Sequence, residues 1–134
     1  HAVESLCSIN TQPLVDATSV RALALLGRAL TRYATDPQDL DARLDAQMGA
    51  SLASMGTRRT AYGASHGLGH ALGADAGVPH GITSCLTLHA VLAWNEPVNA
   101  DRQRAVAAAF HSLSSAALAE RTSWPFRNAT NPSS

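Results

Sequence analysis

One stretch of this chain carries most of its information: Gly63-Ala-Ser-His66-Gly-Leu-Gly-His70-Ala-Leu-Gly73-Ala-Asp-Ala-Gly77-Val-Pro79-His80-Gly81. It holds three of the six histidines of the chain within fifteen residues, separated by small residues and turn formers. Imidazole is the commonest neutral metal ligand in proteins and the usual proton carrier near pH 7. Core packing alone does not explain so many histidines and glycines together, so the stretch indicates a functional site.

The pair His66 and His70 is spaced four residues apart, which places both side chains on one face of a helix, where they could bind one ion. A zinc protease helix needs Glu directly after the first His, and Gly67 occupies that position. Helical di-iron sites need Glu-x-x-His pairs, and the sequence contains none. These two familiar helical metal chemistries are therefore excluded.

His80 adds a geometric condition to any shared metal site. In a continuous helix it would lie about 21 Å from His66, whereas metal–nitrogen bonds are only about 2 Å long. Shared coordination therefore requires the chain to reverse between these two residues. Gly73, Gly77 and Pro79 favour such a reversal, because glycine tolerates a positive φ and proline fixes φ.

The two glycines between the first histidines need a separate explanation. Gly67 and Gly69 each cost roughly 1 kcal/mol relative to Ala inside a helix. We expect close approach of a bulky ligand or of another backbone segment to offset this cost. His89 and His111 have no comparable neighbours in sequence, and for both we expect a structural role.

The overall pattern predicts an all-α fold, a helical bundle of about five to six helices. Apolar residues recur at spacings of three and four, and no segment alternates as a strand would. The expected helices span approximately residues 1–6, 13–35, 37–55, 65–74, 80–94 and 99–121. Residues 1–120 are the expected helical metal-binding domain, and residues 121–134 are expected to form a loose polar tail.

Local signals also predict helix starts and core faces. Pro13 suits the first position of a helix, and Asp36 followed by Pro37 predicts an N-cap and a new helix. Both methionines are expected to fill the core. The residues expected to face the core are Leu23, Leu26, Leu30 and Tyr33, then Leu40, Leu44, Met48, Leu52 and Met55, and finally Val106, Phe110, Leu113 and Ala117.

Composition limits the partners of the chain. Ten basic residues balance ten acidic ones, so no field attracts nucleic acid or anionic lipid. No apolar run is long enough to span a bilayer, and no secretory signal is recognisable. Cys7 and Cys85 lack CxxC spacing, which favours two reduced, buried thiols in a cytoplasmic protein. The chain begins at His1 in what reads as the middle of a helix, so we expect a piece of a longer protein.

The histidine-rich stretch resembles the iron-containing (group III) alcohol dehydrogenases, a family that includes the maleylacetate reductases. Their helical C-terminal domain carries His-x-x-x-His, then Gly, then a turn ending in Pro-His-Gly, at the spacing of His66, His70 and His80. Residues 85–95 are similar to the family's next helix, and His1-Ala-Val-Glu4 is similar to its upstream segment Asp-x-x-x-His-Ala-Val/Ile-Glu. The resemblance covers residues 1 to about 120.

The resemblance implies a site and a reaction. His1, His66 and His80 would bind the metal, usually Fe²⁺ and sometimes Zn²⁺, while His70 would lie close to the nicotinamide and the substrate as the catalytic and cofactor-binding residue. The implied reaction is hydride transfer between a small alcohol or carbonyl compound and NAD(P). The metal would act as a Lewis acid on the substrate oxygen, and His70 would position the reacting groups or pass a proton.

The chain also departs from the family pattern. The family's fourth ligand, an Asp four residues before its first His, would precede residue 1, and we expect the family's N-terminal nucleotide-binding domain to be missing from this piece. His89 and Ala90 replace the family's usual Pro and His. We therefore expect a fragment that is inactive alone and that belongs, with its nucleotide-binding domain, to a protein that could be a homo-oligomer. Two alternatives stay open: a maleylacetate reductase of the same family, and a non-enzymatic helical module whose histidines bind a metal.

Overall fold

The computed structural model describes residues 1–111, apart from the side chain of His111. The expected tail, Leu113 and Ala117 lie outside the described residues. The structure contains α1 (Ala2–Cys7), α2 (Pro13–Thr35), α3 (Leu40–Ser54), α4 (Ala64–Ala76) and α5 (His80–His111). The all-α expectation is confirmed for this part of the chain, and α1, α2, α4 and α5 begin within one residue of their predicted starts. None of these helices is both long and apolar enough to cross a membrane.

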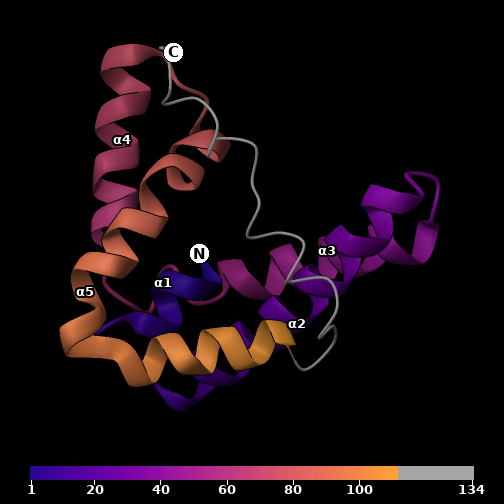
Figure 1. Cartoon of the computed structure of the whole chain (residues 1–134), viewed down its shortest axis with the longest axis horizontal. Coiled ribbons are helices and arrows are strands. Elements are labelled where there is room, and N and C mark those ends of the chain that lie inside the picture. The colour runs from indigo at the N-terminus through magenta and orange to yellow at the C-terminus, as the bar shows by residue number, and fades with distance from the viewer. Residues whose placement is uncertain (112–134) are drawn as a thin grey trace, which may run out of the picture.

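The helices form two pairs (Figure 1). α2 and α3 lie side by side as one pair, and α4 with the first half of α5 forms the other. The short α1 lies where the two pairs meet, in contact with α2, α3 and α5. This arrangement places the N-terminal segment beside the start of α4.

The predicted start of the third helix is wrong by a few residues. Asp36 instead ends α2, where its N–H donates to the carbonyl of Arg32 at 2.9 Å. The Asp36 carboxylate accepts from the backbone N–H of Gln38 at 2.9 Å, which closes a local turn. Asp39 is the N-cap of α3, and its side chain accepts from the N–H of Ala42 at 3.0 Å. Because Asp36 is used in this turn, α3 begins after the next aspartate, Asp39.

This cap predicts a pH dependence. The pKa of Asp39 lies below its ordinary value of 3.8, first because the N–H of Ala42 donates to the carboxylate and also because the Arg32 guanidinium contacts it. A carboxylate with a lowered folded-state pKa stabilises the fold above its ordinary pKa, and this contribution is lost as the pH falls through the lowered value. Asp39→Asn keeps an acceptor but removes the charge. We expect its unfolding free energy to fall less than that of the wild type on acidification, measured by urea unfolding between about pH 6 and pH 2.5. An identical acid dependence of both chains would contradict this role.

α3 packs on α2 through small residues and not through the predicted apolar stripe. Its buried residues are Ala42, Gly49 and Ala53. A Cβ added at Gly49 would lie only 2.8 Å from the Cγ of Leu26, so the two helices are too close for large side chains at this contact. The expectation of a core face, including both methionines as core filler, is therefore wrong for four exposed residues: Leu40, Leu44, Met48 and Met55. In α2, Leu23 is buried as predicted, whereas Leu30 and Tyr33 are exposed.

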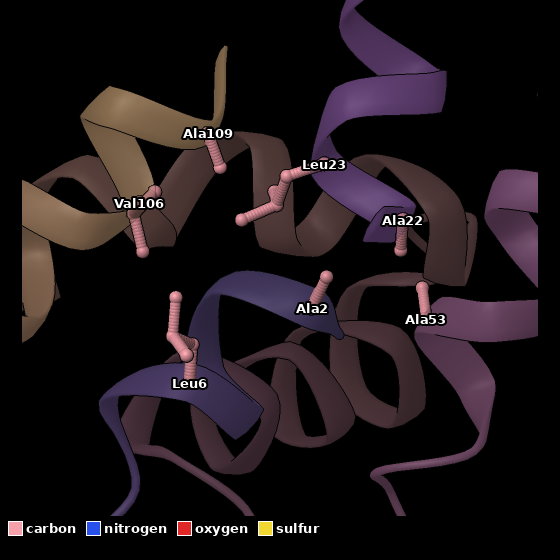
Figure 2. Close-up of a cluster of buried hydrophobic side chains, with 7 residues drawn as sticks. All are labelled: Ala2, Leu6, Ala22, Leu23, Ala53, Val106 and Ala109. Carbon is pink, nitrogen blue, oxygen red and sulfur yellow. The ribbon is translucent and has the colours of Figure 1, made fainter. Parts of the chain in front are cut away.

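A small core holds α1 in place (Figure 2). An isolated helix of six residues is not stable in water, so α1 depends on its packing. Phe110 of α5 packs against this core, as expected from its place on the predicted core-facing side of the last helix. The core residues come from α1, α2, α3 and the end of α5, and they are mostly small: Ala2, Leu6, Ala22, Leu23, Ala53, Val106 and Ala109.

The two helices expected after His80 form one bent element. α5 continues through Pro97, and the break falls at Asn99, whose backbone (φ −138°, ψ 23°) is not helical. The side chain of Gln103 spans the bend, donating to the carbonyl of Leu92 at 2.7 Å and to the side-chain oxygen of Asn99 at 2.8 Å. The bend lets the first half of α5 follow α4 while the second half runs along α2 (Figure 1).

Both cysteines are free thiols. Cys7 is partly buried, and this burial is the main cause that raises its pKa. Cys85 is exposed, which corrects the expectation that both thiols are buried.

Candidate metal centre

Four imidazoles from three separate segments come together beside α1. His1 precedes α1, His66 and His70 lie on α4, and His80 begins α5. The ring centroids are 4.6 Å apart for His1 and His66, 5.9 Å for His66 and His80, 5.2 Å for His70 and His80, and 6.5 Å for His66 and His70. The structure thus gathers all four residues named from the sequence, and their roles as ligands or catalyst remain a prediction. His89 lies on an exposed part of α5, apart from this cluster.

A sharp turn after α4 returns His80 to the cluster. Gly77 ends α4 in the left-handed conformation, with φ 64° and ψ 20°. Pro79 follows, and α5 begins at the next residue. Gly73 remains helical, and a Cβ added there would make an ordinary contact with the carbonyl of Val78 at 3.5 Å. The expected reversal is present, and Gly77 supplies its positive φ.

This turn leads to a prediction about two glycines. An L-residue in the left-handed region costs roughly 1–2 kcal/mol, so Gly77→Ala should lower the unfolding free energy by about 1 kcal/mol or more. Gly67 is helical, and a Cβ added there would meet no atom within 4 Å. Gly67→Ala should therefore raise the unfolding free energy by up to about 1 kcal/mol. Urea unfolding of both variants measures the difference, and effects of the same sign would contradict this account.

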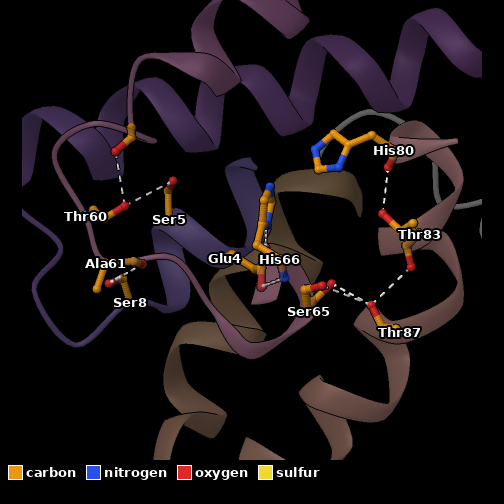
Figure 3. Close-up of polar contacts among 11 residues, drawn as sticks. Glu4, Ser5, Ser8, Thr60, Ala61, Ser65, His66, His80, Thr83 and Thr87 are labelled. Carbon is orange, nitrogen blue, oxygen red and sulfur yellow. Dashed lines mark hydrogen bonds and ion pairs between the residues drawn. The ribbon is translucent and has the colours of Figure 1, made fainter. Parts of the chain in front are cut away.

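Hydroxyl groups join α4 to α5 next to the cluster (Figure 3). The hydroxyls of Ser65 and Thr87 lie 3.0 Å apart, and the Thr83 hydroxyl donates to the carbonyl of His80 at 2.8 Å. Ser65 and Thr83 are fully buried. A Cβ added at Gly69 would lie 2.7 Å from the Thr83 hydroxyl oxygen, so a side chain of α5 explains this glycine. At Gly67 the expected close approach is not found among the described residues.

The connection before α4 is attached to α1 and to the turn that follows it. The Thr60 hydroxyl contacts that of Ser5 at 3.4 Å, and the N–H of Ala61 donates to the side-chain oxygen of Asn10 at 2.8 Å. Gly56 allows this contact, because a Cβ there would lie 2.6 Å from the Ser5 hydroxyl oxygen. The sequence gives no signal for the attachment of this connection to α1.

Glu4 is the site residue that the sequence analysis left without a role. Its carboxylate lies against His66, contacting both the backbone N–H and the ring Nδ1 of that residue (Figure 3). The side chains of Glu4 and His66 are 10% and 4% exposed, so the contact is nearly closed to water. The sequence offered two signals for it: its position one helical turn after His1, and its match to the Glu of the family's upstream segment.

The four imidazoles are chemically suitable ligands for a divalent metal. Neutral imidazoles bind both iron and zinc. The rings of His1 and His66 are stacked with an interplanar angle of 26°, so their nitrogens do not point at a common position. Accordingly, no three His, Cys, Asp or Glu side chains within residues 1–111 are placed to hold an ion. His66 is buried, whereas His1, His70 and His80 are exposed and have room to turn. Coordination therefore requires reorientation of exposed rings around a fixed His66.

A shallow hollow of about 450 Å³ opens beside the exposed rings. Two glycines, Gly69 and Gly73, line it together with His70. The full lining is Gly69, His70, Gly73, Ala74, Val78 and His80. The arrangement can therefore accept a group of small-ring size close to His70.

Comparison with known proteins identifies the relatives of this chain. The family model described as Fe-containing alcohol dehydrogenase family, C-terminal, matches residues 1–123. Maleylacetate reductase 1 of Cupriavidus pinatubonensis is 32% identical over 104 residues, which cover 78% of this chain and 29% of that protein. The protein of Escherichia coli K12 named probable alcohol dehydrogenase EutG is 27% identical over 102 residues, which cover 76% of this chain and 26% of that protein.

A solved structure supports the same relationship. The crystal structure of a Ralstonia eutropha JMP134 protein named a putative alcohol dehydrogenase matches with a TM-score of 0.72 and 29% identity, covering 84% of this chain and 34% of that one. The chain thus spans about a quarter to a third of the length of these relatives. Because the family model covers nearly the whole sequence and the helices superpose on a solved relative, the chain belongs to the iron-containing alcohol dehydrogenase family and corresponds to its C-terminal domain.

Proposed function

We propose that this chain is the helical, metal-bearing part of an oxidoreductase that transfers a hydride between an alcohol or carbonyl compound and NAD(P). The observation that carries the proposal is the convergence of His1 and His80, from opposite parts of the described chain, on the buried His66. These three residues would hold Fe²⁺, with Zn²⁺ as the alternative. The bound metal would supply a Lewis acid for the substrate oxygen.

The four imidazoles would have different roles, according to how exposed each one is. His66 is buried and held by Glu4, so it would give the site a fixed point. His1 and His80 are exposed and would turn toward that point. His70 lies beside the hollow on α4, where it would position the nicotinamide and the substrate or pass a proton between substrate and solvent.

The proposal includes a partner domain. The relatives are about three to four times as long as the matched part of this chain, which leaves room in them for a nucleotide-binding domain. We propose that such a domain binds NAD(P) and presents the nicotinamide to the hollow beside His70. Assembly into a homo-oligomer and a cytoplasmic location belong to the same proposal.

Two measurements test this function. Titration of the chain with Co²⁺, a spectroscopic substitute for Fe²⁺ and Zn²⁺, should give one ion per chain and visible ligand-field bands. The complete protein, loaded with Fe²⁺, should then reduce NAD(P)⁺ in the presence of a primary alcohol. No Co²⁺ binding would overturn the metal centre. Stoichiometric Co²⁺ binding by the chain, with no turnover by the complete protein, would support the non-enzymatic module instead.

A maleylacetate reductase is the second candidate, because maleylacetate reductase 1 is 32% identical over 78% of this chain. Sulfoacetaldehyde reductase of Bilophila wadsworthia is also 32% identical, over 108 residues that cover 80% of this chain and 28% of that protein. The values of kcat/KM of the complete protein for maleylacetate, sulfoacetaldehyde and a primary alcohol distinguish these substrates. A kcat/KM for maleylacetate about 100-fold or more above that for the other two substrates would identify the protein as a maleylacetate reductase. This ratio corresponds to about 2.7 kcal/mol of transition-state stabilisation.

A further inference from the structure

The start of α4 lacks the side-chain cap that helices usually carry. Its N-cap is Gly63, which has no side chain to accept from the first N–H groups of the helix. Ser, Thr, Asp and Asn are the residues that normally do so. In this fold a carboxylate from another helix takes that place, because Glu4 of α1 reaches the first turn of α4.

Glu4 contacts His66 with both of its carboxylate oxygens. Oε1 accepts from the backbone N–H of His66 at 3.4 Å, an N–H that also donates to the carbonyl of Gly63 at 3.1 Å. Oε2 pairs with the ring Nδ1 of the same residue. One carboxylate thus holds the backbone and the ring of His66 together, which restricts both the start of α4 and the rotation of the imidazole.

Gly63 makes this approach possible. A Cβ added at Gly63 would overlap Oε1 of Glu4 and would lie only 2.9 Å from its Cδ. Any side chain at this position would therefore displace the carboxylate. This steric condition explains why the cap position of α4 is a glycine and why the capping group comes from α1.

The contact also decides which nitrogen of His66 is free. A carboxylate accepts hydrogen bonds and does not donate them, so the ring hydrogen lies on Nδ1. In the neutral ring Nε2 then carries the lone pair, at the end of the ring that points away from Glu4 (Figure 3). A second partner that fixes the tautomer and orientation of a ligating histidine is a common requirement of metal sites.

We infer that Glu4 is a positioning residue that holds His66 in its Nδ1–H tautomer and presents Nε2 as the metal-binding atom, with Gly63 as the steric requirement for this contact. The inference rests on the proposed function, because it assigns His66 a metal to bind. Glu4 acts through His66 and does not touch the metal or the substrate.

The first test reads the tautomer without any metal. In ¹⁵N NMR spectra of the chain at about pH 8, above the ordinary histidine pKa of about 6.5, His66 should show the Nδ1–H form. Glu4→Ala and Gly63→Ala should both shift His66 toward the Nε2–H form, and Glu96→Gln, a change at an exposed glutamate of α5, should not. Finding the wild-type ring in the Nε2–H form, or unchanged in both variants, would overturn the inference.

The second test reads the affinity for Co²⁺. Loss of an orienting partner typically costs 10–100-fold in metal affinity, so Glu4→Ala and Gly63→Ala should weaken binding by about that factor. Glu4→Gln keeps one acceptor oxygen and should fall between wild type and Glu4→Ala. If the wild type binds and the variants bind within about twofold of it, the positioning role fails while the proposed function stands. If the wild type does not bind Co²⁺, the proposed function itself fails.

Discussion

Replacing His66 or His80 with alanine should weaken Co²⁺ binding by about 100-fold or more, because each change removes a proposed ligand and even the loss of a supporting partner costs 10–100-fold. His70→Ala should leave the affinity within about threefold, since His70 is proposed to face the nicotinamide and not the metal. His89→Ala is the matched control, a histidine of α5 outside the cluster. Isothermal titration of the four variants measures these affinities.

The pattern among the variants distinguishes two ligand sets. The spacing of His66 and His70 alone suggests that these two neighbours on α4 share the ion, whereas the family resemblance selects His66 and His80. The centroid separations do not favour the first set, because His66 lies 6.5 Å from His70 and 5.9 Å from His80. Loss of binding in His70→Ala together with full binding in His80→Ala would show that the proposed set is wrong. Circular dichroism of each variant confirms that the helices remain, since removing His66 also leaves the Glu4 carboxylate without its partner.

Leu6→Ala should lower the unfolding free energy by about 2–5 kcal/mol, the usual cost of emptying a buried leucine site. Leu6 is 1% exposed and is the large side chain that α1 contributes to the core. Because α1 also carries Glu4 next to the metal centre, we expect Co²⁺ affinity to fall as the packing of α1 loosens. Urea unfolding followed by circular dichroism measures the loss of stability.

Leu44→Ala makes the same chemical change on α3 and is the control. Leu44 is 57% exposed, so this substitution should change the unfolding free energy by less than about 1 kcal/mol. Comparing the two variants also tests the structure against the apolar periodicity of the sequence. The periodicity places Leu44 in the core, whereas in the structure it is exposed. Equal losses in both variants would show that the stripe on α3 is buried as the periodicity predicts.

Much of the local structure was predictable because its signals are local. Pro13 lacks an N–H and has a fixed φ, which favours the first position of a helix, and α2 begins there. Gly77 tolerates a positive φ, and α4 ends there with φ 64°. The start of α3 was misplaced because two aspartates compete for the cap, and only the assembled turn shows that the Asp36 carboxylate is already used by Gln38.

The faces of the helices were less predictable than their positions. Periodicity shows that α3 has an apolar side, but it does not show how closely another helix approaches. Gly49 and its alanine neighbours allow α2 to approach so closely that this small-residue face is the one buried, and Leu44 and Met48 remain outside. The bend of α5 was also not predictable from local residues. Gln103 stabilises it through hydrogen bonds to Leu92 and Asn99 that form only after the chain has turned at Asn99.

The sequence by itself determined that the chain is helical, where most helices begin, and that His66, His70 and His80 could form a site, because propensity, turn residues and motif spacing act over a few neighbouring residues. His1 joined this set only through the resemblance to a known family. The tertiary structure alone decided that Glu4 meets His66 across 62 positions of the chain and which end of that imidazole stays free. Contacts between residues so far apart in sequence depend on how α1 packs against the other helices. A local pattern of residues does not predict that packing.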